Sequence, residues 1–196
     1  FAQLLQKHAG LPEPAHRDAE QIVQAALHGR EVVKKLLLFA RQSDAQKVRL
    51  DLCELIRESH YFLEARCRKS GIEVRLELSD EPLFIVAVRA EIIQVLVNLA
   101  VNAIQAMPDG GFMNIRANAD DQSVMLIVED TGKGMDEETR RRLFTPFFTT
   151  KDVGEGTGLG LSISHHIVAA HGGRIEVESE PGMGACFRVF FPLMIA

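Results

Sequence analysis

Residues 154–161, Gly-Glu-Gly-Thr-Gly-Leu-Gly-Leu, decide what kind of fold this chain can adopt. The glycines expose backbone N–H groups, and residues 159–171 are predicted to form a helix whose positive N-terminal end favours an anion. A dinucleotide-binding fold would need a strand immediately before these glycines and a parallel βαβ unit. Residues 144–158 instead predict a loop, so we expect a triphosphate site in another type of α/β fold.

The sequence on either side of this stretch predicts an α+β domain over residues 46–196. Alternating apolar residues indicate strands, whereas a period of 3.6 residues indicates helices. The expected fold is a two-layer α/β sandwich, a mixed and largely antiparallel sheet with helices on one face. The predicted strands are 72–78, 83–88, 112–118, 124–129, 174–179 and 186–191, and the predicted helices are 50–70, 90–107, 137–143 and 159–171.

Residues 1–45 predict part of a helical hairpin. Pro12 and Pro14 interrupt any helix, because proline lacks a backbone donor and restricts the residue before it. This leaves residues 1–9 as a short first arm and residues 17–41 as the second. The second arm has the four-three spacing of a coiled-coil seam, which favours a homodimer, although an ordinary amphipathic core helix is an equal alternative. The seam residues are Ile22, Ala26, Gly29, Val33, Leu36 and Ala40.

Composition excludes several classes of protein. The chain has 196 residues, 46% of them hydrophobic and 25% charged, with a net charge of −5. This is typical of globular proteins and gives no basic surface for nucleic acid. The three cysteines indicate neither a disulfide framework nor a zinc site, which favours a reducing, cytoplasmic setting. No apolar stretch reaches the roughly 20 residues that cross a bilayer. We therefore expect no membrane contact here, although the parent protein could be anchored.

Asn98 and Asn102 are four residues apart, so on a helix they lie on one face. Their amides would line one wall of a pocket, and an amide oxygen is a suitable ligand for Mg²⁺. Two asparagines at a helix cap or on the surface are the commoner explanation of an isolated pair.

Residues 130–135, Asp-Thr-Gly-Lys-Gly-Met, follow a predicted strand. Gly132 and Gly134 allow a sharp turn close to a flat ligand. The Asp130 carboxylate can accept a hydrogen bond from the adenine amino group but would face the carbonyl oxygen of guanine. The pattern therefore predicts preference for ATP over GTP, although Asp-x-Gly-x-Gly alone is usually an ordinary turn.

Residues 144–148, Phe-Thr-Pro-Phe-Phe, lie in the predicted loop before the glycines. We expect this loop to cover the nucleotide, with Phe144 and Phe147 as apolar anchors and Lys151 reaching a phosphate. A solvated loop lysine is the alternative for Lys151. His165 and His166 are adjacent, so they point in different directions and are predicted to be one packing and one surface residue.

Together, in this order, these four blocks resemble the N box, first glycine box, F box and second glycine box of sensor histidine kinases. That family belongs to an ATPase superfamily with gyrase, the ninety-kilodalton chaperones and mismatch-repair proteins. The resemblance covers residues 50–192 and implies ATP and Mg²⁺ as cofactors. It also implies a magnesium ligand at Asn102, and adenine packing at Met135. Asn98 stands where chaperone ATPases carry a water-activating glutamate, which suits phosphate transfer rather than hydrolysis.

The resemblance assigns catalysis to Asn98, Asn102 and Lys151. It implies nucleotide binding by a larger set that the boxes contain. That set is Asn98, Asn102, Asp130, Thr131, Gly132, Gly134, Met135, Phe144, Phe147, Lys151, Gly154, Gly156, Thr157, Gly158, Leu159 and Gly160. Val88 departs from the family, where an aspartate often precedes the N-box helix, and this change removes a helix cap.

The family transfers the γ-phosphoryl group to a histidine followed by Asp or Glu, and none of the seven histidines here is so followed. Residues 1–5, Phe-Ala-Gln-Leu-Leu, are similar to the sequence that follows such a histidine. The expected function is therefore the ATP-binding core of a histidine kinase whose acceptor lies upstream, serving a response-regulator receiver domain. The alternatives are a degenerate nucleotide-binding regulator and an ATP-hydrolysing chaperone or DNA-repair relative.

Overall fold

The computed structural model describes residues 12–40, 46–151 and 156–193, without the side chains of residues 28 and 31–40. The chain divides into two compact units. One contains residues 1–43 and 151–157, and the other, here called the sheet domain, contains residues 44–150 and 158–196. The predicted domain boundary at residue 45 stays a prediction.

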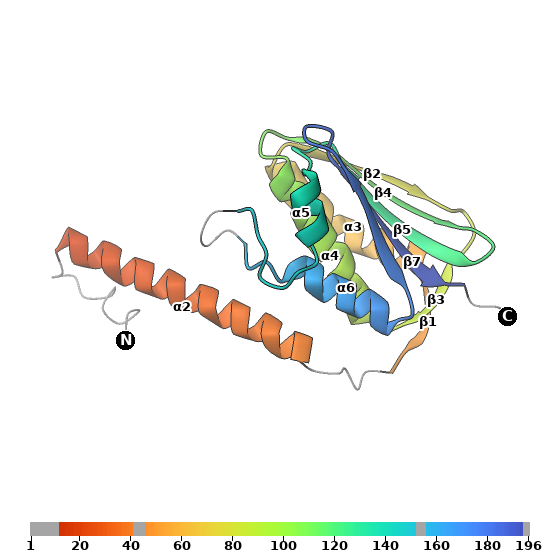
Figure 1. Cartoon of the computed structure of the whole chain (residues 1–196), viewed down its shortest axis with the longest axis horizontal. Helices are drawn as coiled ribbons and strands as arrows, with labels where there is room; N and C mark the ends of the chain where they lie inside the picture. The colour runs from red at the N-terminus through yellow and green to blue at the C-terminus, as the bar shows by residue number, and fades with distance from the viewer. Residues whose placement is uncertain (1–11, 41–45, 152–155, 194–196) are drawn as a thin grey trace. The chain divides into compact units, whose positions relative to one another are not determined.

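Helix α2 (Glu13–Ala40) is the described helix of the first unit (Figure 1). We expected a break through Pro14 and a start at Arg17, but the helix begins four residues earlier. A proline is accepted in the first turn because its missing N–H would have no partner there. Ile22 of the predicted seam is 57% exposed. The predicted first arm, residues 1–9, lies outside the described residues.

The sheet domain contains a five-stranded sheet in which only the β2–β4 pair is parallel. This confirms the predicted mixed and largely antiparallel sheet. The hairpin expected at residues 112–129 is present, since β4 and β5 pair in antiparallel register. In spatial order the strands are β2 (Ile72–Leu78), β4 (Gly111–Ala119), β5 (Ser123–Asp130), β7 (Ala185–Pro192) and β6 (Arg174–Ser179).

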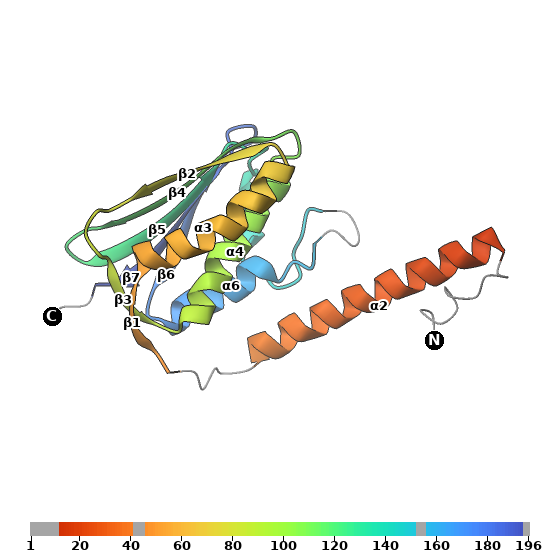
Figure 2. The ribbon, with the colours of Figure 1, turned by 180° about the vertical axis from the view of Figure 1, so that it is seen from behind.

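Helices cover one face of this sheet, as Figures 1 and 2 show from opposite sides. They are α3 (Leu52–Lys69), α4 (Arg89–Ala106), α5 (Glu137–Arg142) and α6 (Gly160–Ala170). Leu96 and Leu99 of α4 and Ile115 of β4 are buried in the core. The other face carries ion pairs such as Arg116–Glu129. One apolar face and one charged face explain why the helices gather on a single side.

A strand, β1 (Val48–Asp51), stands where the predicted helix over residues 50–70 was expected to begin. It pairs with β3 (Phe84–Ala87) in a separate two-stranded antiparallel sheet. The Asp51 carboxylate then caps α3 by accepting the N–H of Cys53 at 2.9 Å. The helix prediction was therefore wrong for Leu50 and Asp51, because pairing with β3 outweighs local helix propensity.

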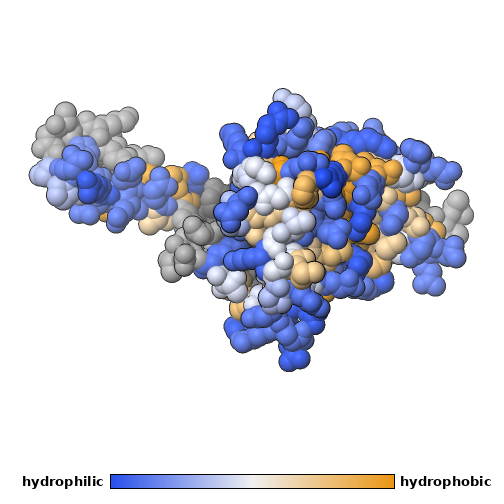
Figure 3. All heavy atoms as spheres, turned by 90° about the horizontal axis from the view of Figure 1, so that it is seen from above, coloured by the Kyte–Doolittle hydropathy of each residue, from blue (hydrophilic) through white to orange (hydrophobic). Residues whose placement is uncertain are grey.

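The surface of the sheet domain is mainly hydrophilic, with an apolar area visible from above (Figure 3). Within the described part of the chain, no helix combines the length and apolar character that a bilayer crossing demands.

Candidate functional site

Asp130 is the last residue of β5 and only 5% exposed. It lies between Met113 of β4 and Ala185 of β7 in the sheet register. Its Oδ1 accepts the N–H of Gly132 at 2.9 Å. Burial raises the pKa of the Asp130 carboxyl, and the backbone hydrogen bonds of Gly132 and Ala185 oppose this rise. A buried carboxylate with few donors gains from a ligand that supplies another N–H group.

The loop after Asp130 is held by hydrogen bonds from two directions. Lys133 N–H donates to the carbonyl oxygen of Ala106, at the end of α4, at 3.0 Å. Gly182, in the turn between β6 and β7, donates to the Lys133 carbonyl at 2.7 Å. Met135 N–H donates to Ser179 Oγ at 2.9 Å. The loop is therefore fixed before any ligand binds.

Two glycines allow this close packing. Gly134 has a φ of +63°, and a Cβ on it would lie 1.9 Å from the carbonyl oxygen of Glu180. A Cβ on Gly132 would lie 2.6 Å from the carbonyl oxygen of Ala106. Neither position has room for any other residue without movement of the backbone. Packing inside the protein therefore requires glycine at both, and the close approach to a flat ligand stays a prediction.

Asn98, on α4, faces helix α6. Its Nδ2 group donates to the carbonyl oxygen of Gly160 at 3.0 Å and to Ser164 Oγ at 3.1 Å. Its amide hydrogens therefore join the helix of the N box to the helix of the second glycine box. Asn102 lies one turn further along α4 and is partly exposed. Asn98 and Asn102 thus both lie near one side of α4, but the Asn98 amide also has a scaffold role that spacing alone did not predict.

Helix α6 begins at Gly160, close to the start predicted at Leu159. The Leu159 side chain is buried, and its carbonyl accepts the N–H of Ile163 at 2.9 Å and the hydroxyl of Ser162 at 3.0 Å. The backbone N–H groups of the first turn point along the helix axis, where the helix dipole favours negative charge.

A backbone hydrogen bond at Phe147 closes the loop that contains the F box. The N–H of Phe147 donates to the carbonyl oxygen of Gly158 at 3.0 Å, and the φ of Phe147 is 65°, a left-handed conformation that is strained for phenylalanine. Phe147 is 59% exposed, which differs from the apolar anchor that we expected. Phe144 is partly buried, and its ring lies against the His165 ring with a centroid distance of 4.9 Å. His165 and His166 are both exposed, so the expected packing histidine is a surface residue that contacts Phe144.

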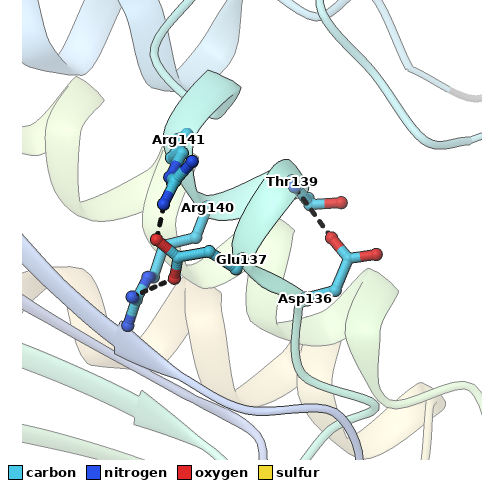
Figure 4. A network of polar contacts seen from close by, with 5 residues as sticks. All are labelled: Asp136, Glu137, Thr139, Arg140 and Arg141. Atoms are coloured by element: carbon cyan, nitrogen blue, oxygen red, sulfur yellow. Dashed lines mark hydrogen bonds and ion pairs between the residues drawn. The ribbon is translucent and has the colours of Figure 1, made fainter.

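Helix α5, between the first glycine box and the F box, carries a set of charged side chains (Figure 4). The Asp136 carboxylate caps the helix by accepting Thr139 N–H at 2.8 Å. The hydrogen bond from Arg141 to Glu137, together with the ion pair to Arg140, holds the pKa of the Glu137 carboxyl below its usual value. These pairs are exposed to solvent, so they orient the side chains more than they stabilise the fold.

Thr131 connects the loop after Asp130 to the β4–β5 hairpin, because its Oγ1 accepts the N–H of Phe112 at 3.1 Å. Four other predicted residues are not among the described residues of the sheet domain. Lys151, Gly156 and Thr157 belong to the unit that includes residues 1–43, and Gly154 lies outside the described residues. Their roles stay predictions.

Asn102 is the predicted magnesium ligand, and its role stays a prediction. Among the residues that the structure describes, no three His, Cys, Asp or Glu side chains gather as a metal site. An amide oxygen such as that of Asn102 suits Mg²⁺, which keeps several waters and is usually held by phosphate oxygens as well. A resident metal bound by protein alone would need more charged ligands than this.

Three side chains that support the site were not predicted. Ser164 accepts from Asn98, Ser179 accepts from Met135 N–H, and His171 Nε2 accepts from Val88 N–H at 3.0 Å. The position of Ser164, four residues after Gly160 and thus on the same side of α6, was a usable signal. All three contacts join segments far apart in sequence, and for Ser179 and His171 the local pattern holds no comparable signal.

Comparison with known proteins gives consistent matches. The family model described as histidine kinase-, DNA gyrase B-, and HSP90-like ATPase matches residues 87–195. Sporulation kinase A of Bacillus subtilis is 37% identical over 162 residues, which is 82% of this chain and 26% of that protein. The chain therefore spans about a quarter of the length of that relative.

Solved structures agree in fold. The catalytic domain of histidine kinase ThkA has a TM-score of 0.68 at 38% identity, covering 76% of this chain and 96% of that chain. The structure of ThkA in complex with the response regulator TrrA has a TM-score of 0.77 at 31% identity, and the match covers 99% of this chain and 56% of that chain. The structure of full-length ShkA in complex with AMPPNP has a TM-score of 0.80 at 29% identity, and the match covers 100% of this chain and 42% of that chain.

Proposed function

Because this chain belongs to the histidine kinase-, DNA gyrase B- and HSP90-like ATPase family, we propose that it binds Mg·ATP for transfer of the γ-phosphoryl group to a histidine. Its catalytic domain is of the histidine kinase type. The observation that carries the proposal is the buried Asp130 carboxylate beside a fixed loop. Sporulation kinase A and ThkA, which are similar to this chain, are named as kinases.

Asp130 would recognise the base. Its carboxylate accepts hydrogen bonds only, so it pairs with the amino group of adenine and repels the carbonyl oxygen at the same place in guanine. The raised pKa of this buried carboxyl means that solvation of its charge is incomplete. A hydrogen bond from adenine compensates for part of that loss. Thr131, Gly132, Gly134 and Met135 would complete the base site.

Asn102 and the start of α6 would hold the triphosphate. The Asn102 amide oxygen would bind a magnesium ion that bridges phosphate oxygens, and the ion would neutralise charge there. The first-turn N–H groups from Gly160 onward would face the phosphates, with Gly158 and Leu159 shaping the approach. The complex of ShkA with AMPPNP, an ATP analogue, supports nucleotide binding by this fold. Phe144, Phe147, Lys151, Gly154, Gly156 and Thr157 would contribute from the loop before α6.

Asn98 would favour transfer over hydrolysis. An amide has no proton-accepting nitrogen or carboxylate with which to activate water. Its hydrogens are also engaged with Gly160 and Ser164, so it holds the two helices that carry the site. The incoming nucleophile would then be an imidazole rather than water.

The acceptor imidazole would belong to a histidine outside this chain. None of the seven histidines precedes Asp or Glu, and His171 is buried with both ring nitrogens engaged. We further propose that the whole protein dimerises through the unit that contains α2, acts in the cytoplasm, and passes phosphate to a receiver domain. The complex of ThkA with TrrA supports that partner class.

Two measurements on the chain test the proposal. Titration with ATP in the presence of Mg²⁺ should give saturable binding, and incubation with γ-radiolabelled ATP should leave no acid-labile, base-stable label on the chain. Absence of binding would favour the degenerate regulator instead. Stable label on one of its own histidines would refute the external acceptor.

A further inference from the structure

His171 follows α6 as its C-cap and is buried, with a side chain only 1% exposed. Its Nδ1 lies 2.8 Å from the carbonyl oxygen of Ile167, and its Nε2 accepts the N–H of Val88 at 3.0 Å. A carbonyl oxygen can only accept, so Nδ1 carries the proton and Nε2 is the free acceptor. The two bonds together require one tautomer of the neutral imidazole.

Val88 is the N-cap residue of α4, and its own side chain makes no capping hydrogen bond. In a capping box, the third helical residue would accept the N–H of the N-cap residue through its carboxylate. Glu91 occupies that position, but its Oε2 lies 3.7 Å from His171 Nε2, and His171 accepts the N–H instead. His171, at the end of α6, therefore accepts the Val88 N–H that Glu91 of α4 would accept in a capping box.

A second polar junction joins the same two helices near the start of α6. Asn98 donates there to Gly160 and Ser164. Val88 and Asn98 are ten residues apart, and Gly160 and His171 are eleven apart. At a rise of about 1.5 Å per residue these spans are about 15 Å and about 16 Å, so the junctions match in spacing along antiparallel helices.

We propose that His171 is a positioning residue for the nucleotide site. By fixing the start of α4 against the end of α6, it sets the angle at which α4 presents Asn98 and Asn102 to the first turn of α6. Loss of the Val88 bond leaves a buried N–H without its partner and frees the two helices to shift at that end. The inference rests on the proposed ATP site.

The test compares substitutions that keep or remove the acceptor for Val88 N–H. His171→Gln can place an amide oxygen near the position of Nε2, whereas His171→Asn reaches Ile167 only and His171→Leu makes neither bond. Two controls change the same region without touching the junction. Val168→Ala removes buried volume from α6, and Lys47→Ala removes an exposed bond to the carbonyl oxygen of Ala170.

Binding of AMPPNP with Mg²⁺ is measured for each variant at a temperature where circular dichroism shows it fully folded. We expect His171→Leu and His171→Asn to weaken binding about tenfold and His171→Gln to stay within about threefold of the wild type. Val168→Ala should melt at a lower temperature, yet both controls should bind as the wild type does.

Wild-type affinity in folded His171→Leu would overturn the inference. If that variant does not fold, equal affinities for His171→Asn and His171→Gln overturn it. A loss of affinity in Val168→Ala as large as in His171→Asn would show that His171 acts only through stability. Failure of the wild type to bind AMPPNP would instead refute the proposed function itself.

Discussion

The two ends of the proposed ATP site are built differently. At the base end, the loop after Asp130 is continuous in sequence and held by Ala106, Ser179 and Gly182 within the sheet domain. At the phosphate end two helices meet, because Asn98 of α4 donates to Gly160 and Ser164 of α6. The base end is therefore one loop held by several backbone hydrogen bonds, whereas the phosphate end depends on how two helices pack together.

This difference assigns separate tasks to the two ends. A site formed in advance gives selectivity, because its polar groups cannot move to suit the wrong base. A site formed where two helices meet can respond to a shift of one helix against the other. We expect substitutions at the base end to act on nucleotide choice and stability, and those at the phosphate end to act on the metal-dependent part of binding.

Gly134→Ala should have the largest effect, because a Cβ there would lie 1.9 Å from the carbonyl oxygen of Glu180 at a φ of +63°. We expect a loss of more than about 2 kcal/mol in the free energy of unfolding, together with loss of ATP binding. Urea denaturation and ATP titration measure both quantities.

Gly182→Ala is the matched control, since Gly182 also has a positive φ of +78° but has nothing within 4 Å of a Cβ. It should cost only about 1 kcal/mol and leave ATP binding intact. Equal losses in the two variants would mean that backbone conformation, and not close packing of the loop, accounts for the effect.

Asp130→Asn should weaken ATP binding about a hundredfold, because the substituted amide can turn an N–H group toward the adenine amino group. Discrimination against GTP should fall at the same time. Asp120→Asn is the control, since Asp120 is an exposed turn residue that accepts the N–H groups of Gln122 and Ser123. ATP affinity that is the same in both variants would exclude Asp130 from the base site.

Asn102→Ala should act on the phosphate end and only when the metal is present. With Mg²⁺ we expect ATP affinity to fall about tenfold, and with a chelator we expect little difference from the wild type. Isothermal titration under both conditions measures this. Equal losses with and without Mg²⁺ would argue for a packing role and against metal binding.

The substitution Asp130→Asn should also have a smaller effect on folding stability, and this effect should be a gain and not a loss. Burial raises the pKa of the Asp130 carboxyl in the folded state above 3.8. The contribution of this carboxyl to folding stability is therefore favourable below its unfolded-state pKa, and it is lost as the pH rises through the folded-state pKa. Ionised Asp130 therefore lowers the stability of the ligand-free protein near neutral pH. Asp130→Asn should raise the melting temperature at about pH 7, with a gain that shrinks at acid pH. A lower melting temperature at neutral pH would contradict this.

Long and regular segments could be predicted from the sequence. Helix α4 and the β4–β5 hairpin were predicted nearly to their ends, because their apolar periodicity is strong and uninterrupted. The short strand β1 was missed, since residues 48–51 pair with residues 84–87, more than thirty residues away. Four residues carry too little local pattern to oppose a helix that follows directly.

Some local features of the candidate site were predicted, but its side-chain contacts were not. The position of Asp130 at a strand end and the need for Gly134 followed from the sequence. That Asn98 would donate to Gly160, or that His171 would accept from Val88, depends on how α4 packs against α6. Such side-chain contacts are set by tertiary packing, which spacing along one helix does not reveal.

The most direct test of the account compares ATP with GTP. Isothermal titration of the chain with each nucleotide and Mg²⁺ should show one ATP bound per chain, at least about tenfold more tightly than GTP. That preference should disappear in Asp130→Asn. Equal affinity for the two nucleotides in the wild type, or no binding of ATP, would contradict the assignment of Asp130 as the residue that selects the base.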